Sequence, residues 1–301
     1  MKKIFLTVFV TVFMIFGCSD TNRNVEKEKK NIVVSTFAIY DIASFIAKGK
    51  VEVSMLIPPG KEIHSFEPTP KDIVKLKKAV LFIYSGAGLE PWVTQFEHIT
   101  DTLDLSKYVK LRKFEHLHHH HHAGAIDPHY WLDFENMQKA TDVITEALIK
   151  IVPKQKSFFL KQAQEYKKKL QNLDQKFSIA LKTCKKKEIF VNHNAYSYLA
   201  QRYGFKVESL VGLSPDAKPS PKTVQDTIDL IKKEKVKVLF CESFENSSIL
   251  KNIAKDTGVK VETLQPLANV TADEIQQKLD YEQIMLQNLQ KLQTALECNG
   301  I

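Results

Sequence analysis

Residues 153–182 read PKQKSFFLKQAQEYKKKLQNLDQKFSIALK, and this stretch decides the fold. It holds no glycine, and its one proline is the first residue. Its apolar residues recur at intervals of three and four, the period of one helix face: Phe159, Ala163, Tyr166, Leu170, Leu173, Phe177 and Leu181. At about 1.5 Å per residue, such a helix is roughly 45 Å long. We therefore expect a rod between two halves of the chain, rather than a surface helix or one that breaks midway.

Short apolar runs alternate with helix-like runs on both sides of this rod. We expect strands at residues 31–36, 51–57, 80–84, 188–192, 206–211, 236–241 and 260–264. We expect helices at residues 40–47, 70–78, 134–151, 195–203, 221–235, 247–256 and 273–296. Apolar strands that alternate with helices are typical of parallel sheets covered on both faces, so the sequence predicts an α/β fold.

The N-terminus indicates export. Lys2 and Lys3 precede an apolar stretch over residues 4–16. A membrane span needs about 20 apolar residues, and the polar run at residues 19–30 ends this stretch too early. We therefore interpret residues 1–17 as a signal peptide.

The end of that signal peptide resembles a bacterial lipobox, because Gly17 precedes Cys18. This pattern predicts cleavage before Cys18 and a lipid on its sulfur; ordinary cleavage near Gly17 is the alternative. We expect the mature protein in the periplasm or at the outer face of the cytoplasmic membrane. Its only membrane contact would be a lipid anchor at Cys18.

Composition narrows the class of protein further. With 301 residues, 26% charged and 10% aromatic, the chain suits about two globular domains and is neither mainly disordered nor a multi-span membrane protein. The net charge of +8 comes almost entirely from lysine, because Arg23, Arg112 and Arg202 are the only arginines. Proteins that read nucleic-acid sequence depend on the arginine fork, so no nucleic-acid partner is expected.

Cys184, Cys241 and Cys298 follow Cys18 in the sequence. An exported chain can oxidise a pair of cysteines, and these three allow three single pairings. We favour Cys241–Cys298, because it would tie the last helix to its own half of the chain; buried free thiols are the alternative. No C-x-x-C spacing indicates a zinc knuckle or a redox motif.

Six of the ten histidines lie within residues 116–122. Neutral imidazole is a good ligand for zinc, copper and nickel, but consecutive side chains cannot all reach one rigid site. We expect weak, exchanging metal sites on a loop, formed by His116, His118, His119, His120, His121 and His122. The alternatives are an engineered tag and a low-complexity insertion without function.

Three other histidines occupy loop positions near the ends of expected elements. His64 follows a proline-glycine loop after the strand at 51–57, His129 follows a proline ahead of a helix, and His193 follows the strand at 188–192. In open α/β sheets, ligands bind at the carboxyl ends of strands. The sequence therefore favours a joint metal site, although a lone histidine is more often structural.

These histidines lie in stretches that resemble the zinc-binding subunits of bacterial ABC importers, the ZnuA-like members of the cluster A-I substrate-binding proteins. The matching stretches are HSFEPTPKD at 64–72, DPHYWLD at 127–133 and HNAYSYLAQRYG at 193–204, with GLSP at 212–215 and Glu242. The resemblance spans essentially the whole mature chain. It implies two (β/α)₄-type lobes with parallel sheets, joined by one long rigid helix, and a metal site in the cleft between the lobes.

By this resemblance the metal ligands are His64, His129 and His193, and the polyhistidine stretch is the His-rich loop of zinc-specific members. Imidazole nitrogens suit Zn²⁺, whereas Mn²⁺ favours oxygen donors. The family often has an acidic residue where Gln265 stands. We therefore expect three histidines plus water, with Gln265 beside the metal or a weak fourth ligand, and Glu62 as another candidate for that position.

The resemblance implies an extracytoplasmic, high-affinity Zn²⁺-binding protein that delivers zinc, its transported substrate, to an ABC permease. A zinc ion with three histidine ligands and one open coordination position is also typical of the active site of a zinc-dependent hydrolase. Glu62 or Glu242 would then be the general base. No H-E-x-x-H or nucleophile motif supports that reading, so we expect no enzyme. A metal-binding surface adhesin or lipoprotein is the remaining alternative.

The expected organisation is a monomer with two lobes. Its segments are a signal peptide at 1–17, a polar tether at 18–30, an N-terminal lobe at 31–152 with the His-rich loop at 115–126, a connecting helix at 153–182 and a C-terminal lobe at 183–301.

Overall fold

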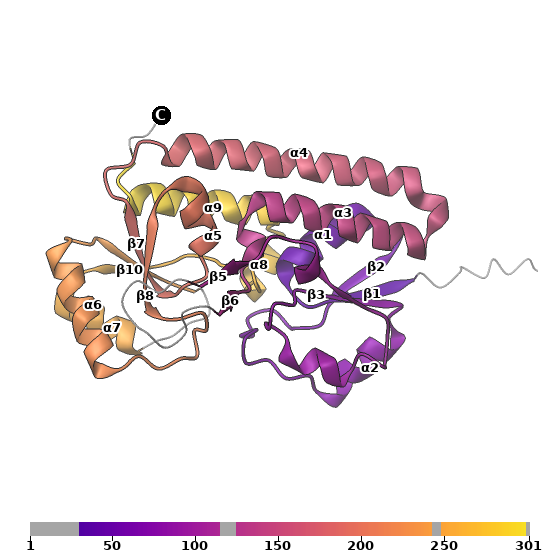
Figure 1. Ribbon diagram of the computed structural model, residues 1–301, viewed down its shortest axis with the longest axis horizontal. Helices are drawn as coiled ribbons and strands as arrows, with labels where there is room; N and C mark the ends of the chain where they lie inside the picture. The colour runs from indigo at the N-terminus through magenta and orange to yellow at the C-terminus, as the bar shows by residue number, and fades with distance from the viewer. Residues whose placement is uncertain (1–29, 115–124, 243–247, 299–301) are drawn as a thin grey trace, which may run out of the picture.

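A computed structural model describes residues 30–114, 125–242 and 248–298 of the chain. Two four-stranded sheets form the centres of two lobes, which lie side by side (Figure 1). The N-terminal sheet has the order β2-β1-β3-β4 and the C-terminal sheet the order β10-β9-β7-β8. Every pairing within these two sheets is parallel. The predicted α/β fold with two parallel sheets is confirmed.

The N-terminal sheet contains a strand that the sequence did not reveal. The bounds of its strands are β1 Asn31–Val34, β2 Glu52–Met55, β3 Leu81–Tyr84 and β4 Thr102–Asp104. The missed strand, β4, has three residues at the edge of the sheet, where it pairs only with β3. So short a run gives no periodicity, and its pairing depends on β3.

The C-terminal sheet agrees with the expected strands. Its strands are β7 Glu188–His193, β8 Lys206–Val211, β9 Val238–Cys241 and β10 Lys260–Thr263. A small antiparallel pair, β5 Arg112–Lys113 and β6 Ile126–Asp127, lies between the lobes in the view of Figure 1. This pair brackets the stretch 115–124, so most of the His-rich loop predicted at 115–126, with all six of its histidines, lies outside the described residues.

Helices cover both sheets and connect the lobes. Their bounds are α1 Phe37–Ala47, α2 Pro70–Lys78, α3 Phe134–Ile151, α4 Lys156–Leu181, α5 Ser197–Tyr203, α6 Pro221–Lys233, α7 Ser248–Thr257, α8 Ala272–Gln276 and α9 Tyr281–Ala295. Among the described helices, none is long and apolar enough to cross a bilayer.

The predicted rod is α4, preceded by a 3₁₀ turn at Pro153–Gln155. All seven apolar residues of its expected face are buried. The helix runs along one edge of the molecule over both lobes (Figure 1). Its buried face belongs to a hydrophobic core that includes strand residues of both sheets, such as Val33 and Val191. Because this core is continuous, α4 joins the lobes by packing and not only by chain connection.

The last expected helix, at residues 273–296, is wrong as a single element. It breaks into α8 and α9 around Lys278, which has a left-handed φ of 55°. Asp280 then begins α9 with a capping box, because its carboxylate accepts from the N–H of Gln283 and its own N–H donates to the Gln283 side chain. An internal N-cap of this kind ends one helix and begins the next.

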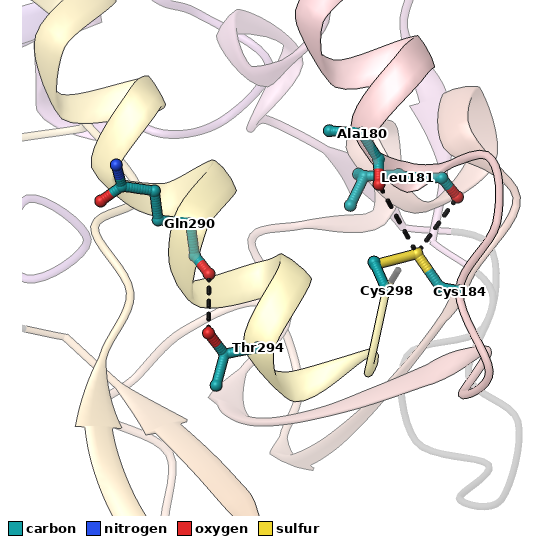
Figure 2. Close-up of a disulfide and its surroundings, with 6 residues drawn as sticks. All are labelled: Ala180, Leu181, Cys184, Gln290, Thr294 and Cys298. Carbon is teal, nitrogen blue, oxygen red and sulfur yellow. Dashed lines mark hydrogen bonds between the residues drawn. A yellow bond between two sulfur atoms is a disulfide. The ribbon is translucent and has the colours of Figure 1, made fainter. Parts of the chain in front are cut away.

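The predicted Cys241–Cys298 disulfide is also wrong, because the structure joins Cys184 to Cys298 and Cys241 takes no part in that bond. Figure 2 shows the bond between the ends of two neighbouring helices, with Cys184 just past α4 and Cys298 just past α9. Cys241 is the last residue of β9, an inner strand of the C-terminal sheet that pairs with β10 and β7. The sequence could not reveal this pairing, since it depends on the packing of α4 against α9.

Candidate metal centre

His64 comes from the loop between β2 and α2. Its backbone N–H donates to Oε1 of Glu62 over 2.9 Å, which fixes the loop locally. Burial, followed by the like charges of His129 and His193, lowers the pKa of His64 to about 2. The ring is therefore neutral at physiological pH, which is the state that binds a metal ion.

His129 lies between β6 and the 3₁₀ turn Tyr130–Leu132, and it is fully buried. Its ring Nδ1 lies 2.8 Å from Oδ1 of Asp127, and its backbone N–H donates to the same oxygen over 2.9 Å. A carboxylate only accepts, so Nδ1 carries the proton and Nε2 presents its lone pair. The ring also packs edge-on against Trp131, with ring centres 5.3 Å apart.

His193 is the last residue of β7 and is buried. Its Nδ1 lies 2.5 Å from Oε1 of Glu242, the residue that follows strand β9. Strands β7 and β9 are neighbours in the sheet, so the parallel pairing brings these two side chains together at its carboxyl edge. Glu242 thus directs the Nε2 of His193 in the way that Asp127 directs that of His129.

The three imidazoles converge on one point, although they come from different lobes. Nε2 of His129 lies 3.3 Å from Nε2 of His64. A ligand nitrogen from each of His64, His129 and His193 lies within 4.8 Å of the other two. Zinc–nitrogen bonds of about 2.0–2.1 Å in a tetrahedral site place nitrogens about 3.3–3.4 Å apart. The geometry therefore makes a three-histidine metal site at the carboxyl ends of the strands.

Asp127 also links the lobes. Its second carboxylate oxygen accepts from the hydroxyl of Ser197, the first residue of α5, and its carbonyl accepts from Tyr198 over 2.9 Å. The guanidinium of Arg112 on β5 donates to the Ser197 carbonyl over 2.6 Å. The carboxylate that orients His129 is thus held by residues of the other lobe.

Glu62 and Gln265, the two candidates for a fourth ligand, differ in how far their side chains are already occupied by protein groups. Burial raises the pKa of Glu62 to about 7, with a second contribution from the charge of Glu242. Gln265 is buried, but its amide nitrogen donates to Glu274 over 3.0 Å and its oxygen accepts from the N–H of Leu267 over 3.4 Å. Both ends of the Gln265 amide are therefore occupied by protein groups.

The model of the family described as "ZnuA: Zinc-uptake complex component A periplasmic" matches residues 32–295 of the chain. The chain belongs to the ZnuA family. It is therefore a zinc-binding component of a zinc uptake system, with a three-histidine metal site, and not an enzyme.

Two curated proteins and one solved structure illustrate the relation to the ZnuA family. The high-affinity zinc uptake system protein ZnuA of Bacillus subtilis (strain 168) is 34% identical over 93% of this chain and 92% of its own length. The zinc-binding lipoprotein AdcA of Streptococcus pneumoniae (strain R6) is 30% identical, and this chain spans 62% of its length. The crystal structure of the Zn(II)-bound ZnuA-like domain of S. pneumoniae AdcA superposes with a TM-score of 0.76 at 29% identity, covering 89% of this chain and 99% of that domain.

The sequence did not predict that Asp127 and Glu242 orient two of the histidines of this ZnuA-family chain. Asp127 stands two residues before His129, which is a signal that local spacing offers. Glu242 lies 49 residues after His193, so only the pairing of β7 with β9 brings it to the ring. The predicted lipidation residue Cys18 and the six histidines of the His-rich loop lie outside the described residues.

Proposed function

We propose that this chain captures Zn²⁺ outside the cytoplasm and delivers it as substrate to an ABC-type permease. The observation that carries the proposal is the 3.3 Å separation of Nε2 of His64 and Nε2 of His129, with His193 completing the set. Zinc is cargo here, so the site has to release it as well as bind it. Three neutral imidazoles leave the charge of the ion uncompensated, which favours release compared with thiolate sites.

In this proposal Zn²⁺ takes one Nε2 from each of His64, His129 and His193, and water takes the fourth position. Asp127 and Glu242 act as the supporting carboxylates that hold ligating imidazoles in proteins. Gln265 is a poor candidate for the fourth ligand because Glu274 and Leu267 occupy both ends of its amide. Glu62, whose Oε1 accepts from the backbone N–H of His64 over 2.9 Å, is the remaining candidate for that position.

The proposed location is the outer face of the cytoplasmic membrane, with a lipid on Cys18. The signal-peptide pattern and the Gly17-Cys18 junction support it, and the curated relative from S. pneumoniae is named a lipoprotein. A polar segment at 18–30 would then separate the lipid from the lobe that begins at β1.

Competition titration with a zinc chelator tests the site. We expect one tight Zn²⁺ per chain in the protein from residue 19 onward, and its loss in His64→Ala and in His193→Ala. His98→Ala is the matched control, because His98 is an exposed histidine outside the site. Tight 1:1 binding that survives both site substitutions would refute the proposed ligands, and normal zinc-limited growth of a strain lacking the protein would refute the role in uptake.

A further inference from the structure

The outer face of α4 carries charge that zinc binding does not use. Five exposed lysines lie on this face of α4 or directly beyond its two ends, and we call them the basic crest: Lys154, Lys161, Lys168, Lys176 and Lys182. Glu165 is the only exposed acidic residue of α4, and its carboxylate accepts from the Gln162 side chain over 3.3 Å. The crest is therefore strongly positive along the whole helix, which at about 1.5 Å per residue is roughly 39 Å long.

Helix geometry places the basic crest opposite the core. Lys161, Lys168 and Lys182 are separated by multiples of seven residues, which return to nearly the same side of a helix. Buried Phe159, Tyr166, Leu173 and Phe177, among other apolar residues, fill the other side. Figure 1 shows α4 at one edge of the molecule, with α1, α3, α5 and α9 between it and the sheets. In the described part of the chain, no helix or strand lies on the outer side of α4 in this view.

Other basic side chains on the flanks of the helix do have acidic partners. Lys167 lies 2.5 Å from Asp142, and Lys169 lies 3.2 Å from Asp280 and 3.1 Å from Glu282. No ion pair joins a crest lysine to a carboxylate of the described part of the chain. The carboxylates near α4 therefore neutralise its flanks and leave the crest uncompensated.

The positive surface continues beyond the end of α4. Lys185 and Lys187 are exposed directly after Cys184, and with Lys206 and Lys235 they line a cavity of about 330 Å³. Six lysines and three glutamates line this cavity, so it carries a smaller positive excess than the crest. Two large apolar side chains also stand on the outer face of α4: Leu160 is 44% exposed and Ile179 is 56% exposed. A row of lysines with a few apolar side chains is the composition of helices that rest on anionic membrane surfaces.

We propose that the basic crest docks on the phosphate headgroups of an anionic membrane. Juxtamembrane lysines each strengthen binding to such a surface about fivefold, and the attraction falls off within a Debye length. Leu160 and Ile179 would enter the headgroup layer. None of His64, His129 and His193 lies on α4, so this contact leaves the metal site free to collect zinc. This contact would keep the protein at the membrane surface before it meets the permease, and it does not depend on the lipid at Cys18.

Vesicle sedimentation tests the crest with the protein from residue 19 onward. The test variant carries Lys161→Gln, Lys168→Gln, Lys176→Gln and Lys182→Gln. The control variant removes the same charge through Lys71→Gln, Lys77→Gln, Lys78→Gln and Lys222→Gln, which are exposed positions on α2 and α6 at the opposite edge of the molecule (Figure 1). Circular dichroism and the zinc titration establish that both variants are folded.

We expect the wild type to bind vesicles rich in phosphatidylglycerol at low salt and not vesicles of pure phosphatidylcholine. The test variant should bind more than about 100-fold more weakly, while the control variant stays within about threefold of wild type. Equal losses in the two variants, or unchanged binding in the test variant, would overturn the proposal. The phosphate that the crest binds could belong to lipid headgroups or be free inorganic phosphate. If about 10 mM inorganic phosphate at constant ionic strength displaced the protein from the vesicles, the crest would be a site for free phosphate and docking on lipid would be overturned.

Discussion

Buried carboxylates accept hydrogen bonds at two places in this molecule, with different consequences. At the metal site, Asp127 and Glu242 each meet the Nδ1 of an imidazole, at 2.8 and 2.5 Å. At a second place, which we call the helix junction, Asp41 of α1 accepts from the hydroxyl of Tyr166 on α4 over 2.7 Å and from the N–H of Tyr281 on α9 over 3.2 Å. An imidazole that donates from one ring nitrogen to a carboxylate still has a second nitrogen that can bind a cation. The Tyr166 hydroxyl and the Tyr281 N–H, which meet Asp41, offer no such second nitrogen.

The metal site and the helix junction are linked by a chain of contacts. The hydroxyl of Tyr281 donates to the carbonyl of Trp131 over 2.6 Å, and the Trp131 ring packs against His129. The comparison teaches that the partner of a carboxylate decides its role. The metal site should govern zinc affinity, and the helix junction should govern the stability of the lobe packing and its pH dependence.

The largest effect on zinc should come from His129→Ala. This change removes a ligand whose ring is fixed by Asp127 and Trp131, so affinity should fall more than about 100-fold, beyond what a lost supporting carboxylate causes. Chelator competition on folded protein measures it. A loss below tenfold would show that His129 is not a ligand, and Asp41→Asn, measured alongside, should stay within about threefold of wild type.

Asp127→Asn and Glu242→Gln should each weaken zinc binding by about 10- to 100-fold. Either amide keeps the shape of the side chain but removes the charge that makes the imidazole a better ligand. The same titration measures both. If either variant bound zinc as tightly as wild type, the carboxylate would serve the fold and not the metal, and the contrast with Asp41 would disappear.

Asp41→Asn should change the pH dependence of stability. Burial raises the pKa of Asp41 from 3.8 to about 6. The folded state holds this proton more tightly than the unfolded chain does. The contribution of Asp41 to the free energy of unfolding should therefore fall as pH rises from about 4 to about 6. The asparagine of the variant does not titrate, so the variant does not lose this contribution. The difference in the free energy of unfolding, variant minus wild type, should therefore increase by about 2–3 kcal/mol between about pH 4 and about pH 6.

Urea unfolding of the metal-free protein at pH 4.5 and pH 7 measures this difference. Subtracting wild type from variant cancels the contributions of other titrating groups, such as the buried Glu90, whose pKa is raised to about 7 by its burial. A difference that is independent of pH would contradict the assignment to Asp41.

The smallest effect should be that of Tyr166→Phe. It removes the hydroxyl donor to Asp41 and should cost about 1 kcal/mol at pH 7, where the acceptor is a carboxylate, and less at pH 4.5. In the Asp41→Asn background the pH dependence of this cost should vanish. The same unfolding experiments measure it, and an equal cost in both backgrounds would show that Tyr166 acts through packing alone.

Patterns with a local cause were predictable from the sequence. The period of the apolar residues in α4 follows from helix geometry, and the apolar strands follow from burial on both faces. His64, His129 and His193 stood out because they lie near the ends of expected elements, and the motif resemblance named them as ligands. The short edge strand β4 and the break before Asp280 were missed, since one depends on a neighbouring strand and the other on a single N-cap within a helical pattern.

Pairs between distant residues could not be predicted. The disulfide joins Cys184 to a residue 114 positions away because α4 and α9 end side by side. Glu242 reaches His193 because β9 pairs with β7, and Ser197 reaches Asp127 because the lobes are packed together.

The sequence by itself determined the long helix, the two parallel sheets and the three candidate histidine ligands, because periodicity and residue chemistry are properties of short stretches. Only the tertiary structure decided that imidazoles from two lobes meet within 4.8 Å and that Asp127 and Glu242 orient two of them. It also decided that Lys167 and Lys169 of α4 pair with carboxylates, whereas the lysines of the basic crest pair with none among the described residues. These relations depend on which surfaces pack together, and packing is a property of the whole chain.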